Sequence, residues 1–403
     1  MRAILHCDLN NFYASCECLG NPELKDKAVA VGGSPEDRHG VIVAANYKAK
    51  SFGIKCGVTV YQAYKLCPEI VICPPNFELY NKMSRRVREI YAEYTDQVEI
   101  FSIDECWLDV TNSGMFGTPE EIANKIRERV KNEVGLTISV GVSFTKTFAK
   151  IGSDLKKPDA TTIINNDNYK QIVWKLPIKD MFGVGKQTAI KLFKLGINII
   201  GDLARYNKEL LIKQFGKVGE ILYNSANGIN DDEVAYLEDE YLPKSVGNST
   251  TFYKDLTERK DVELGFTVIA ESVVGRMIKH NISCAKTLTI VVKDAQLNTY
   301  QKQCQITPPC RDSGVYTRTA LKLFYDNFSN LSGIRLLGIT VTDWCDEFCQ
   351  ISIFDTPKKA KNIDDIMLKI RDKYGASAIK RGNAMLDEKI AKTFMHEHLN
   401  KDN

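Results

Sequence analysis

The sequence lacks both the long apolar runs of membrane proteins and the paired cysteines of many metal sites. No stretch of its 403 residues approaches the roughly 20 apolar residues that a membrane-spanning helix needs. The first eight residues hold too short an apolar run for a signal peptide. The 12 cysteines include no Cys-x-x-Cys pair, which argues against a zinc ribbon or a thioredoxin-type site. We therefore expect a cytoplasmic protein with reduced thiols and no membrane partner.

Charge of one sign is not in large excess either, because the formal net charge is only +3. The charge is nevertheless uneven along the chain. Residues 241–342 hold 13 Lys and Arg against 8 Asp and Glu, whereas residues 231–240 hold six acids and no base. A basic module beside an acidic linker suits binding of a phosphate backbone, although an ordinary solvated surface would give the same counts. The length allows about two to four domains with hydrophobic cores.

Three carboxylates follow two apolar stretches, which we interpret as buried strands. Asp8 ends the stretch 3–8, and Asp104 and Glu105 end the stretch 98–105. Adjacent buried carboxylates repel one another and lose hydration, so a fold retains them where cations neutralise them. Hard oxygen ligands suit Mg²⁺ or Mn²⁺, and two such ions roughly 3.5–4 Å apart catalyse phosphoryl transfer. Because an Asp-Glu pair is more often part of a solvated loop, the carboxylates alone leave the metal site open.

The residues around these carboxylates belong to a series of motifs. The first, at 8–17, is DLNNFYASCE, and the second, at 102–111, is SIDECWLDVT. Further motifs of the series lie at 45–54, 141–150, 154–158 and 243–248. In this order they resemble the motifs of the Y-family DNA polymerases, the lesion-bypass enzymes, over residues 1 to about 355.

The resemblance implies the fold of a right-hand polymerase, multidomain with α/β and α+β parts. The expected parts are a palm at 1–18 and 75–165, small fingers at 19–74, a helical thumb with a helix–hairpin–helix at 166–230, an acidic tether at 231–244, a little finger at 245–348, and a clamp-binding peptide with a charged helical tail at 349–403.

Local patterns agree with such an arrangement. Apolar residues at helical spacing predict a helix over 119–130, and an apolar run predicts a strand over 135–142. In the little finger we expect strands over 288–293 and 334–342 and helices near 261–280 and 317–328. The tail carries Ile363, Ile366, Met367 and Ile370 at helical spacing, and we expect it to be a solvated appendix without a chemical role.

The resemblance also implies the catalytic residues. Asp8 and Asp104 would bridge two Mg²⁺ ions, for which Mn²⁺ can substitute, and Glu105 would complete the site on the primer side. The backbone carbonyl of Leu9 would be a further ligand. Asn10 stands where many relatives carry another acidic residue, but that position is not an essential ligand in the family.

Nucleotide contacts are implied in the same way. Tyr47, Lys50 and Lys157 lie where the family grips the triphosphate, and many members have Arg at the position of Lys50. Lysine supplies a point charge rather than a bidentate fork. Tyr13 would be the steric gate, whose ring leaves no room for a ribose 2′-hydroxyl. Phe12 would be a core residue or the floor of the base pocket.

Two further sites follow from the resemblance. Gly183, Gly185 and Lys186 would bring backbone N–H groups of the thumb close to a DNA phosphate. The segment 350–354, QISIF, resembles the bacterial sliding-clamp peptide, in which Gln350 anchors while Ile353 and Phe354 fill pockets. An edge strand packed on the little finger is the alternative for this segment.

We therefore predict a monomeric, template-directed, low-fidelity DNA polymerase for translesion synthesis, with primer–template DNA, deoxynucleoside triphosphates and the sliding clamp as partners. Two alternatives stay open from the sequence. A nucleotidyl cyclase shares a palm with two-metal carboxylates but needs no thumb. A catalytically silent paralogue could bind DNA and clamp, although a decayed site has no reason to keep clustered charge.

Overall fold

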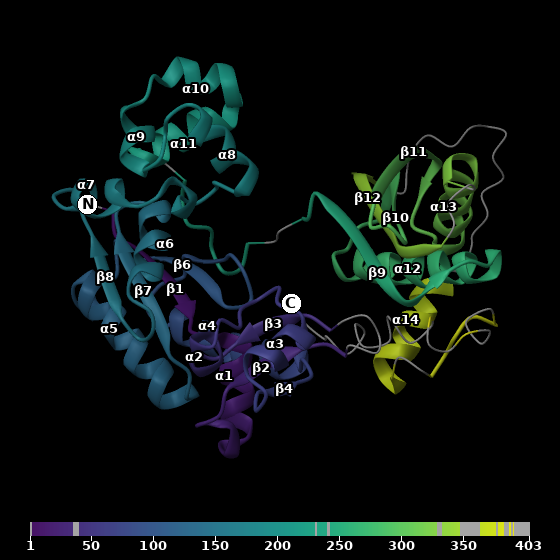
Figure 1. Ribbon diagram of the computed structural model, residues 1–403, viewed down its shortest axis with the longest axis horizontal. Helices are drawn as coiled ribbons and strands as arrows, with labels where there is room; N and C mark the ends of the chain where they lie inside the picture. Colours follow the sequence, from purple (N-terminus) through teal and green to yellow (C-terminus); the bar gives the residue numbers. More distant parts are fainter. Residues whose placement is uncertain are drawn as a thin grey trace. The chain divides into compact units, whose positions relative to one another are not determined.

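The computed structural model describes residues 2–34, 40–229, 232–239, 242–328, 333–346, 363–375, 378–382, 387 and 390. The chain divides into two compact units, one made of 1–32 and 42–239 and the other of 33–41 and 240–403 (Figure 1). Within the described ranges, no helix is long and apolar enough to cross a membrane.

A five-stranded sheet forms the centre of the first unit, with the strand order β5-β6-β1-β7-β8. Only the β7–β8 pair is parallel. The strands are β1 (Ile4–Leu9), β5 (Val98–Ile100), β6 (Glu105–Asp109), β7 (Ile138–Ser143) and β8 (Thr161–Ile164). The flanking helices are α4 (Phe77–Ala92), α5 (Pro119–Arg129) and α6 (Lys146–Leu155).

The central strand β1 is buried on both faces, and its residues alternate between two sets of neighbours. Leu5, Cys7 and Leu9 pack in one core with apolar side chains of α4 and α5. Ile4 packs on the opposite face against Trp107 and Ala149 of α6. Because side chains alternate along a strand, Asp8 shares the α6 face with Ile4. This alternation directs the carboxylate toward the residues of α6 and the segment that follows it.

Helix α6 lies exceptionally close to the sheet at Gly141. A Cβ atom at this position would lie 1.8 Å from the carbonyl oxygen of Ala149, so no residue with a side chain fits there without moving the helix. The contact at Gly141 therefore sets the height of α6 above β1 and β7.

A three-stranded sheet with the order β3-β2-β4 lies where fingers were expected. Its core is built from small side chains such as Ala30, Ala49 and Ala63, with Ile42 and Ile54. Its elements are β2 (Val29–Gly32), β3 (Ile42–Ala45), α2 (Tyr47–Ser51), α3 (Val60–Leu66) and β4 (Val71–Cys73), and the chain enters it through α1 (Phe12–Gly20), which packs in the palm core.

Short helices follow the palm sheet and pack around a core that includes Leu192, Leu203 and Leu211 (Figure 1). They are α7 (Tyr169–Ile172), α8 (Lys186–Lys194), α9 (Ile200–Arg205), α10 (Lys208–Phe215) and α11 (Lys217–Ala226).

Part of the expected acidic tether is packed on the first unit rather than free. Val234 is 1% exposed and belongs to the core with Ile4 and Trp107. The backbone N–H of Ala235 donates to Glu99 at 3.0 Å. Val234 and Ala235 therefore belong to the first unit rather than to a free tether.

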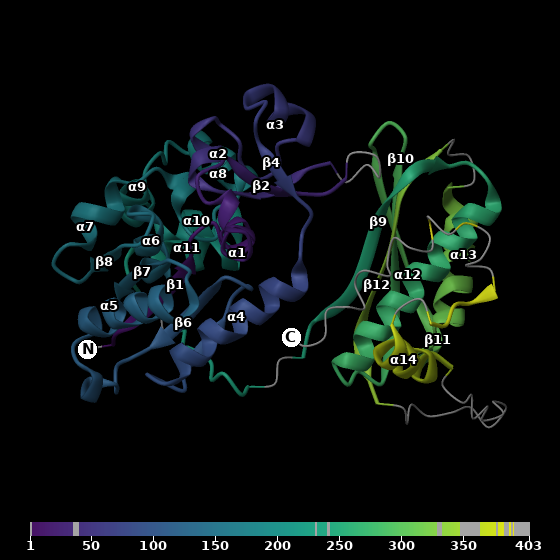
Figure 2. The same cartoon turned by 90° about the horizontal axis from the view of Figure 1, so that it is seen from below.

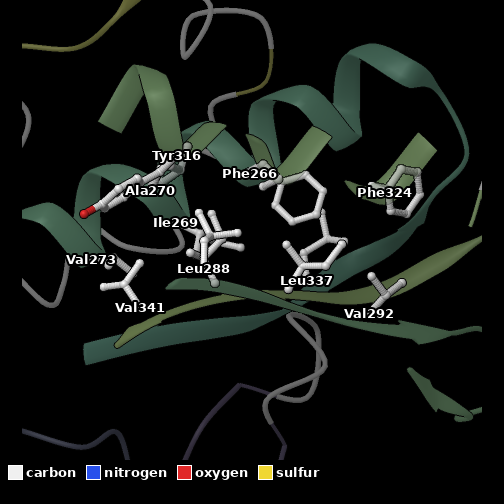
Figure 3. Close-up of a cluster of buried hydrophobic side chains, with 14 of the residues drawn as sticks. Phe266, Ile269, Ala270, Val273, Leu288, Val292, Tyr316, Phe324, Leu337 and Val341 are labelled. Carbon is white, nitrogen blue, oxygen red and sulfur yellow. The ribbon is translucent and has the colours of Figure 1, made fainter. Parts of the chain in front are cut away.

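The second unit is a four-stranded antiparallel sheet with the order β11-β10-β12-β9 and helices on one face (Figure 2). Side chains of α12 and α13, among them Phe266 and Phe324, meet Leu288, Leu337 and Val341 from the sheet (Figure 3). The elements are β9 (Ser245–Leu256), α12 (Arg259–Lys279), β10 (Cys284–Asp294), β11 (Thr299–Cys310), α13 (Ser313–Phe328), β12 (Ile334–Cys345) and α14 (Ile363–Tyr374).

The prediction of a solvated tail is wrong for its described part. Helix α14 packs against α12, and it buries Met367 and Leu368 rather than Ile363 and Ile366. Arg371 of α14 donates to Glu271 of α12 at 2.8 Å, with both side chains about nine-tenths buried. Helix α14 is therefore an added layer beside α12 of the little finger.

Candidate active site

An open cleft of about 330 Å³ gathers most of the predicted site residues. It is bordered by the turn between β1 and α1, by β3 and by the β5–β6 turn. Of the predicted metal and nucleotide residues, it is lined by Asp8, Leu9, Phe12, Tyr13, Lys50, Asp104, Glu105 and Lys157. Residues that lie far apart in the sequence therefore share one concave surface.

The three carboxylates come from the paired ends of two neighbouring strands. Asp8 and Glu105 are direct partners in the antiparallel register of β1 and β6. Asp104 corrects the expectation of a single strand over 98–105, because it lies in a turn between β5 and β6 rather than at a strand end. The turn brings Asp104 beside β1, where the N–H of Leu9 donates to its carbonyl at 3.0 Å.

Lysine side chains neutralise two of these carboxylates. Lys157 Nζ lies 2.8 Å from Asp8 Oδ2 and 2.8 Å from Asp154 Oδ1, and Lys150 binds Glu105. Burial raises the pKa of Asp8 to about 7, against the opposing effect of Lys157. For Glu105, burial would raise the pKa, but the nearby His6 and Lys150 side chains prevail and lower it to about 2. The cleft therefore stabilises positive charge beside Asp8 and Glu105.

His6 is a site neighbour that sequence reasoning missed. It lies two residues before Asp8 on the same face of β1, and its side chain is fully buried. Its Nδ1 lies 2.8 Å from Ser153 Oγ, and its Nε2 lies 3.4 Å from Glu105 Oε2. Burial lowers the pKa of His6. A polar residue in an otherwise apolar strand was the signal that could have identified it.

The three carboxylates fit Mg²⁺ by donor chemistry, but those of Asp8 and Glu105 contact lysines and that of Asp104 accepts from Ser102. Within the described ranges, no group of three His, Cys, Asp or Glu side chains is arranged to hold a metal ion. The three acids nevertheless line one cleft, and all offer hard oxygen atoms. A divalent cation could replace the ammonium groups of Lys157 and Lys150 as the partner of Asp8 and Glu105.

Known proteins match the chain along nearly its whole length. Residues 7–154 match the impB/mucB/samB family, 243–353 match the C-terminal domain of that family, and 179–230 match the DNA polymerase-iota thumb domain. DNA polymerase IV of Acetivibrio thermocellus is 43% identical over 392 residues, which cover 96% of this chain and 98% of that protein. The chain belongs to the DNA polymerase IV family of Y-family DNA polymerases.

Two other comparisons agree with this membership. DNA polymerase IV 1 of Bacillus subtilis is 37% identical over 397 residues, 97% of this chain and 95% of that protein. A chimera of the Y-family DNA polymerases Dbh and Dpo4 has the same fold, with a TM-score of 0.75 at 23% identity over 85% of this chain and 99% of its own. The chain is thus a DNA-directed DNA polymerase with palm, fingers, thumb and little finger, and the nucleotidyl cyclase alternative is set aside.

In this polymerase, Tyr13 belongs to an aromatic cluster beside the carboxylates. Its ring is stacked on Tyr80 with the centroids 4.3 Å apart, and Phe77 meets it edge-on at 6.0 Å. The hydroxyl of Tyr80 donates to Glu17 at 2.5 Å. Phe12 is 3% exposed and packs in the palm core, while it also lines the cleft. Tyr80 and Phe77, three residues apart on α4, were missed because such spacing usually marks only a core face.

The predicted triphosphate contacts lie on α2 and after α6. Lys50 Nζ lies 5.2 Å from the centroid of the Tyr47 ring and donates to Asn11 Oδ1. Tyr47 is 40% exposed. Burial lowers the pKa of Lys50, and the charge of Lys157 lowers it further. Asn11 was not among the predicted site residues, although it lies in the first polymerase motif.

The predicted DNA contacts lie on the thumb rather than in the cleft. Gly183 has a φ of 86°, a conformation that favours glycine, and Gly185 directly precedes α8. Gly183, Gly185 and Lys186 are all exposed. The backbone at the start of α8 is therefore accessible. Gln350, Ile353 and Phe354, which were predicted to bind the clamp, lie outside the described residues.

Proposed function

We propose that this translesion DNA polymerase adds deoxynucleotides to a primer 3′-end in the cleft formed by Asp8, Asp104 and Glu105. The supporting observation is that these carboxylates share one cleft with Lys50, Lys157 and Tyr13. Such a cleft offers cation ligands, phosphate-binding groups and an aromatic ring for the sugar side by side, which is what template-directed phosphoryl transfer requires.

Members of this family generally use Mg²⁺. We propose that Asp8, Asp104 and Glu105, with the backbone carbonyl of Leu9, hold two such ions. When bound, the ions lower the pKa of the primer hydroxyl and neutralise charge on the triphosphate. The palm strands contribute by fixing the ligands, because Asp8 and Glu105 are registered partners on β1 and β6.

Lys157 and Lys50 would bind the triphosphate. Lys157 contacts Asp8 and Asp154, and its place beside a proposed metal ligand supports this role. Lys50 reaches the same cleft from the fingers. Tyr13, supported by Tyr80, would exclude ribonucleotides because its ring occupies the space of a 2′-hydroxyl.

Further partners follow from the rest of the chain. We propose that the exposed backbone at Gly183 and Gly185 contacts a DNA phosphate and that the basic little finger binds the duplex without reading its sequence. Segment 350–354 would dock on the sliding clamp and raise the concentration of the enzyme at the primer end.

Primer extension by Asp104→Ala tests the catalytic proposal. The variant should incorporate no nucleotide in Mg²⁺ while it keeps the melting temperature and the DNA affinity of the parent. Glu128→Ala is a matched control, because it removes an exposed carboxylate of α5 in the same domain. Near-normal extension by Asp104→Ala would refute the two-metal assignment.

A further inference from the structure

Asn11 occupies an unusual place in the turn between β1 and α1. Its backbone is left-handed, with φ 49° and ψ 40°, and it directly precedes the first turn of α1. An asparagine at such a position normally accepts a hydrogen bond from the start of the helix. Here the side chain caps no backbone N–H of α1. Its side-chain amide can therefore form hydrogen bonds with groups outside α1.

The amide of Asn11 instead joins the palm to the fingers. Its Oδ1 accepts a hydrogen bond from Nζ of Lys50, which lies on α2. Because an ammonium group can only donate, the oxygen of the amide must face Lys50. The two N–H groups of Nδ2 are then left beside the ammonium, and no described residue is found to accept from them. Asn11 and Lys50 both line the cleft that holds the carboxylates.

Together the two side chains present a wider set of donors than lysine alone. An isolated lysine is a point charge on a flexible stem, whereas an arginine presents a planar fork of donors. Asn11 restrains the ammonium through one hydrogen bond and adds a planar N–H₂ group next to it. The pair thus resembles an arginine fork assembled from two residues, with the charge on one and the planar donor on the other.

We propose that Asn11 and Lys50 form one composite binding site for the terminal phosphates of the incoming nucleotide, which leave as pyrophosphate. The inference rests on the proposed function of the cleft. Lys157 contacts Asp8 and so lies beside the reacting phosphate, whereas Lys50 contacts Asn11 instead. Asn11 holds Lys50 in position and donates its own amide N–H to the same phosphate oxygens.

Single-nucleotide incorporation by Asn11→Gly tests the composite site. Glycine tolerates the left-handed backbone, so the variant removes the side chain without straining the turn. The KM for the deoxynucleotide should rise roughly tenfold, because a hydrogen bond to a charged group is lost, while kcat changes little. Lys48→Ala is the matched control, since Lys48 lies on the same helix and does not line the cleft.

Double variants separate cooperation from independent effects. Adding Asn11→Gly to Lys50→Ala should raise KM little further, because the two residues act as a unit. Adding Lys50→Arg to Asn11→Gly should restore most of the lost affinity, because arginine carries its own fork. Full additivity of Asn11→Gly and Lys50→Ala would overturn the composite site.

Product inhibition by inorganic pyrophosphate identifies the part of the nucleotide that is bound. The inhibition constant should rise in Asn11→Gly by the same factor as KM. A raised KM with unchanged pyrophosphate inhibition would place the contact elsewhere on the nucleotide and overturn the proposal. If Asn11→Gly matches the parent in both constants while Asp104→Ala is inactive, the composite site is wrong and the proposed function stands. Activity in Asp104→Ala would overturn the proposed function itself.

Discussion

The ring of Tyr80 lies parallel to the ring of Tyr13, with 4.3 Å between the centroids and 16° between the planes. Tyr80 is fully buried, and its hydroxyl is fixed by Glu17. The residue beneath Tyr13 therefore has little freedom to move. A rigid support is what a steric gate needs, because a ring that can withdraw would admit the larger sugar.

Replacing Tyr13 by alanine should admit ribonucleotides. The clash with the 2′-hydroxyl disappears, so discrimination between deoxy- and ribonucleotides should fall on the order of 100-fold or more, while deoxynucleotide use falls less. The ratio of kcat/KM for the two nucleotides measures the effect. Tyr61→Ala removes an exposed ring of the fingers and should leave the ratio unchanged. An unchanged ratio in Tyr13→Ala would show that Tyr13 has only a packing role and does not exclude ribonucleotides.

Asp8 should make the stability of the metal-free protein depend on pH. Burial raises its pKa to about 7, whereas an unfolded aspartate titrates near 3.9. The folded protein thus retains the proton that the unfolded chain releases, so this stabilisation is full below about pH 4 and is lost as pH rises through about 7. In EDTA, Asp8→Asn should equal the parent near pH 4 and exceed its stability at pH 8 by about 1–3 kcal/mol.

Urea unfolding at the two pH values measures this difference. Addition of Mg²⁺ at pH 8 should stabilise the parent, because the ion binds the ionised carboxylate, and should stabilise Asp8→Asn much less. Parallel pH profiles for the two proteins would contradict a raised pKa at Asp8.

The contact between α14 and α12 should stabilise the little finger. Arg371→Ala leaves the buried carboxylate of Glu271 with one cationic partner fewer and should lower the free energy of unfolding by about 1–3 kcal/mol. Lys369→Ala on the exposed side of α14 is the control and should change it by less than about 0.5 kcal/mol. Equal free energies of unfolding for Arg371→Ala and Lys369→Ala would mean that α14 contributes little to the stability of the little finger.

Replacing Gln350, Ile353 and Phe354 together by alanine should abolish stimulation by the sliding clamp. Two buried apolar side chains contribute roughly 1.5–3 kcal/mol each, so their loss should remove most clamp affinity. Primer extension without clamp and the melting temperature should match the parent. A lower melting temperature with retained stimulation would instead favour an edge strand on the little finger.

The sequence predicted those parts of the site that depend on local pattern. Asp8 and Tyr13 lie within a few residues of one another, so one motif places Asp8 near the end of β1 and Tyr13 in the first turn of α1. The position of Asp104 could not be predicted this way, because 98–105 contains no glycine or proline that would indicate the turn between β5 and β6. Pairing of β6 with β1 determines that turn.

Contacts between distant segments were missed for a similar reason. Periodicity correctly predicts a helix in the tail, but the buried face of α14 depends on Glu271 of α12, 100 residues earlier. Likewise, the link between Asn11 and Lys50 joins the palm to the fingers, and no local pattern reports it.

Gly141 has a consequence for how this polymerase tolerates mutation. Any side chain at this position would meet the carbonyl oxygen of Ala149 and push α6 away from the sheet. Helix α6 carries Lys150 and leads directly to Lys157, so both cations beside the carboxylates would shift with it. Random mutagenesis scored by loss of DNA synthesis should therefore recover variants of Gly141 as well as variants of Asp8. The Gly141 variants would be inactive although every side chain that lines the cleft is still present.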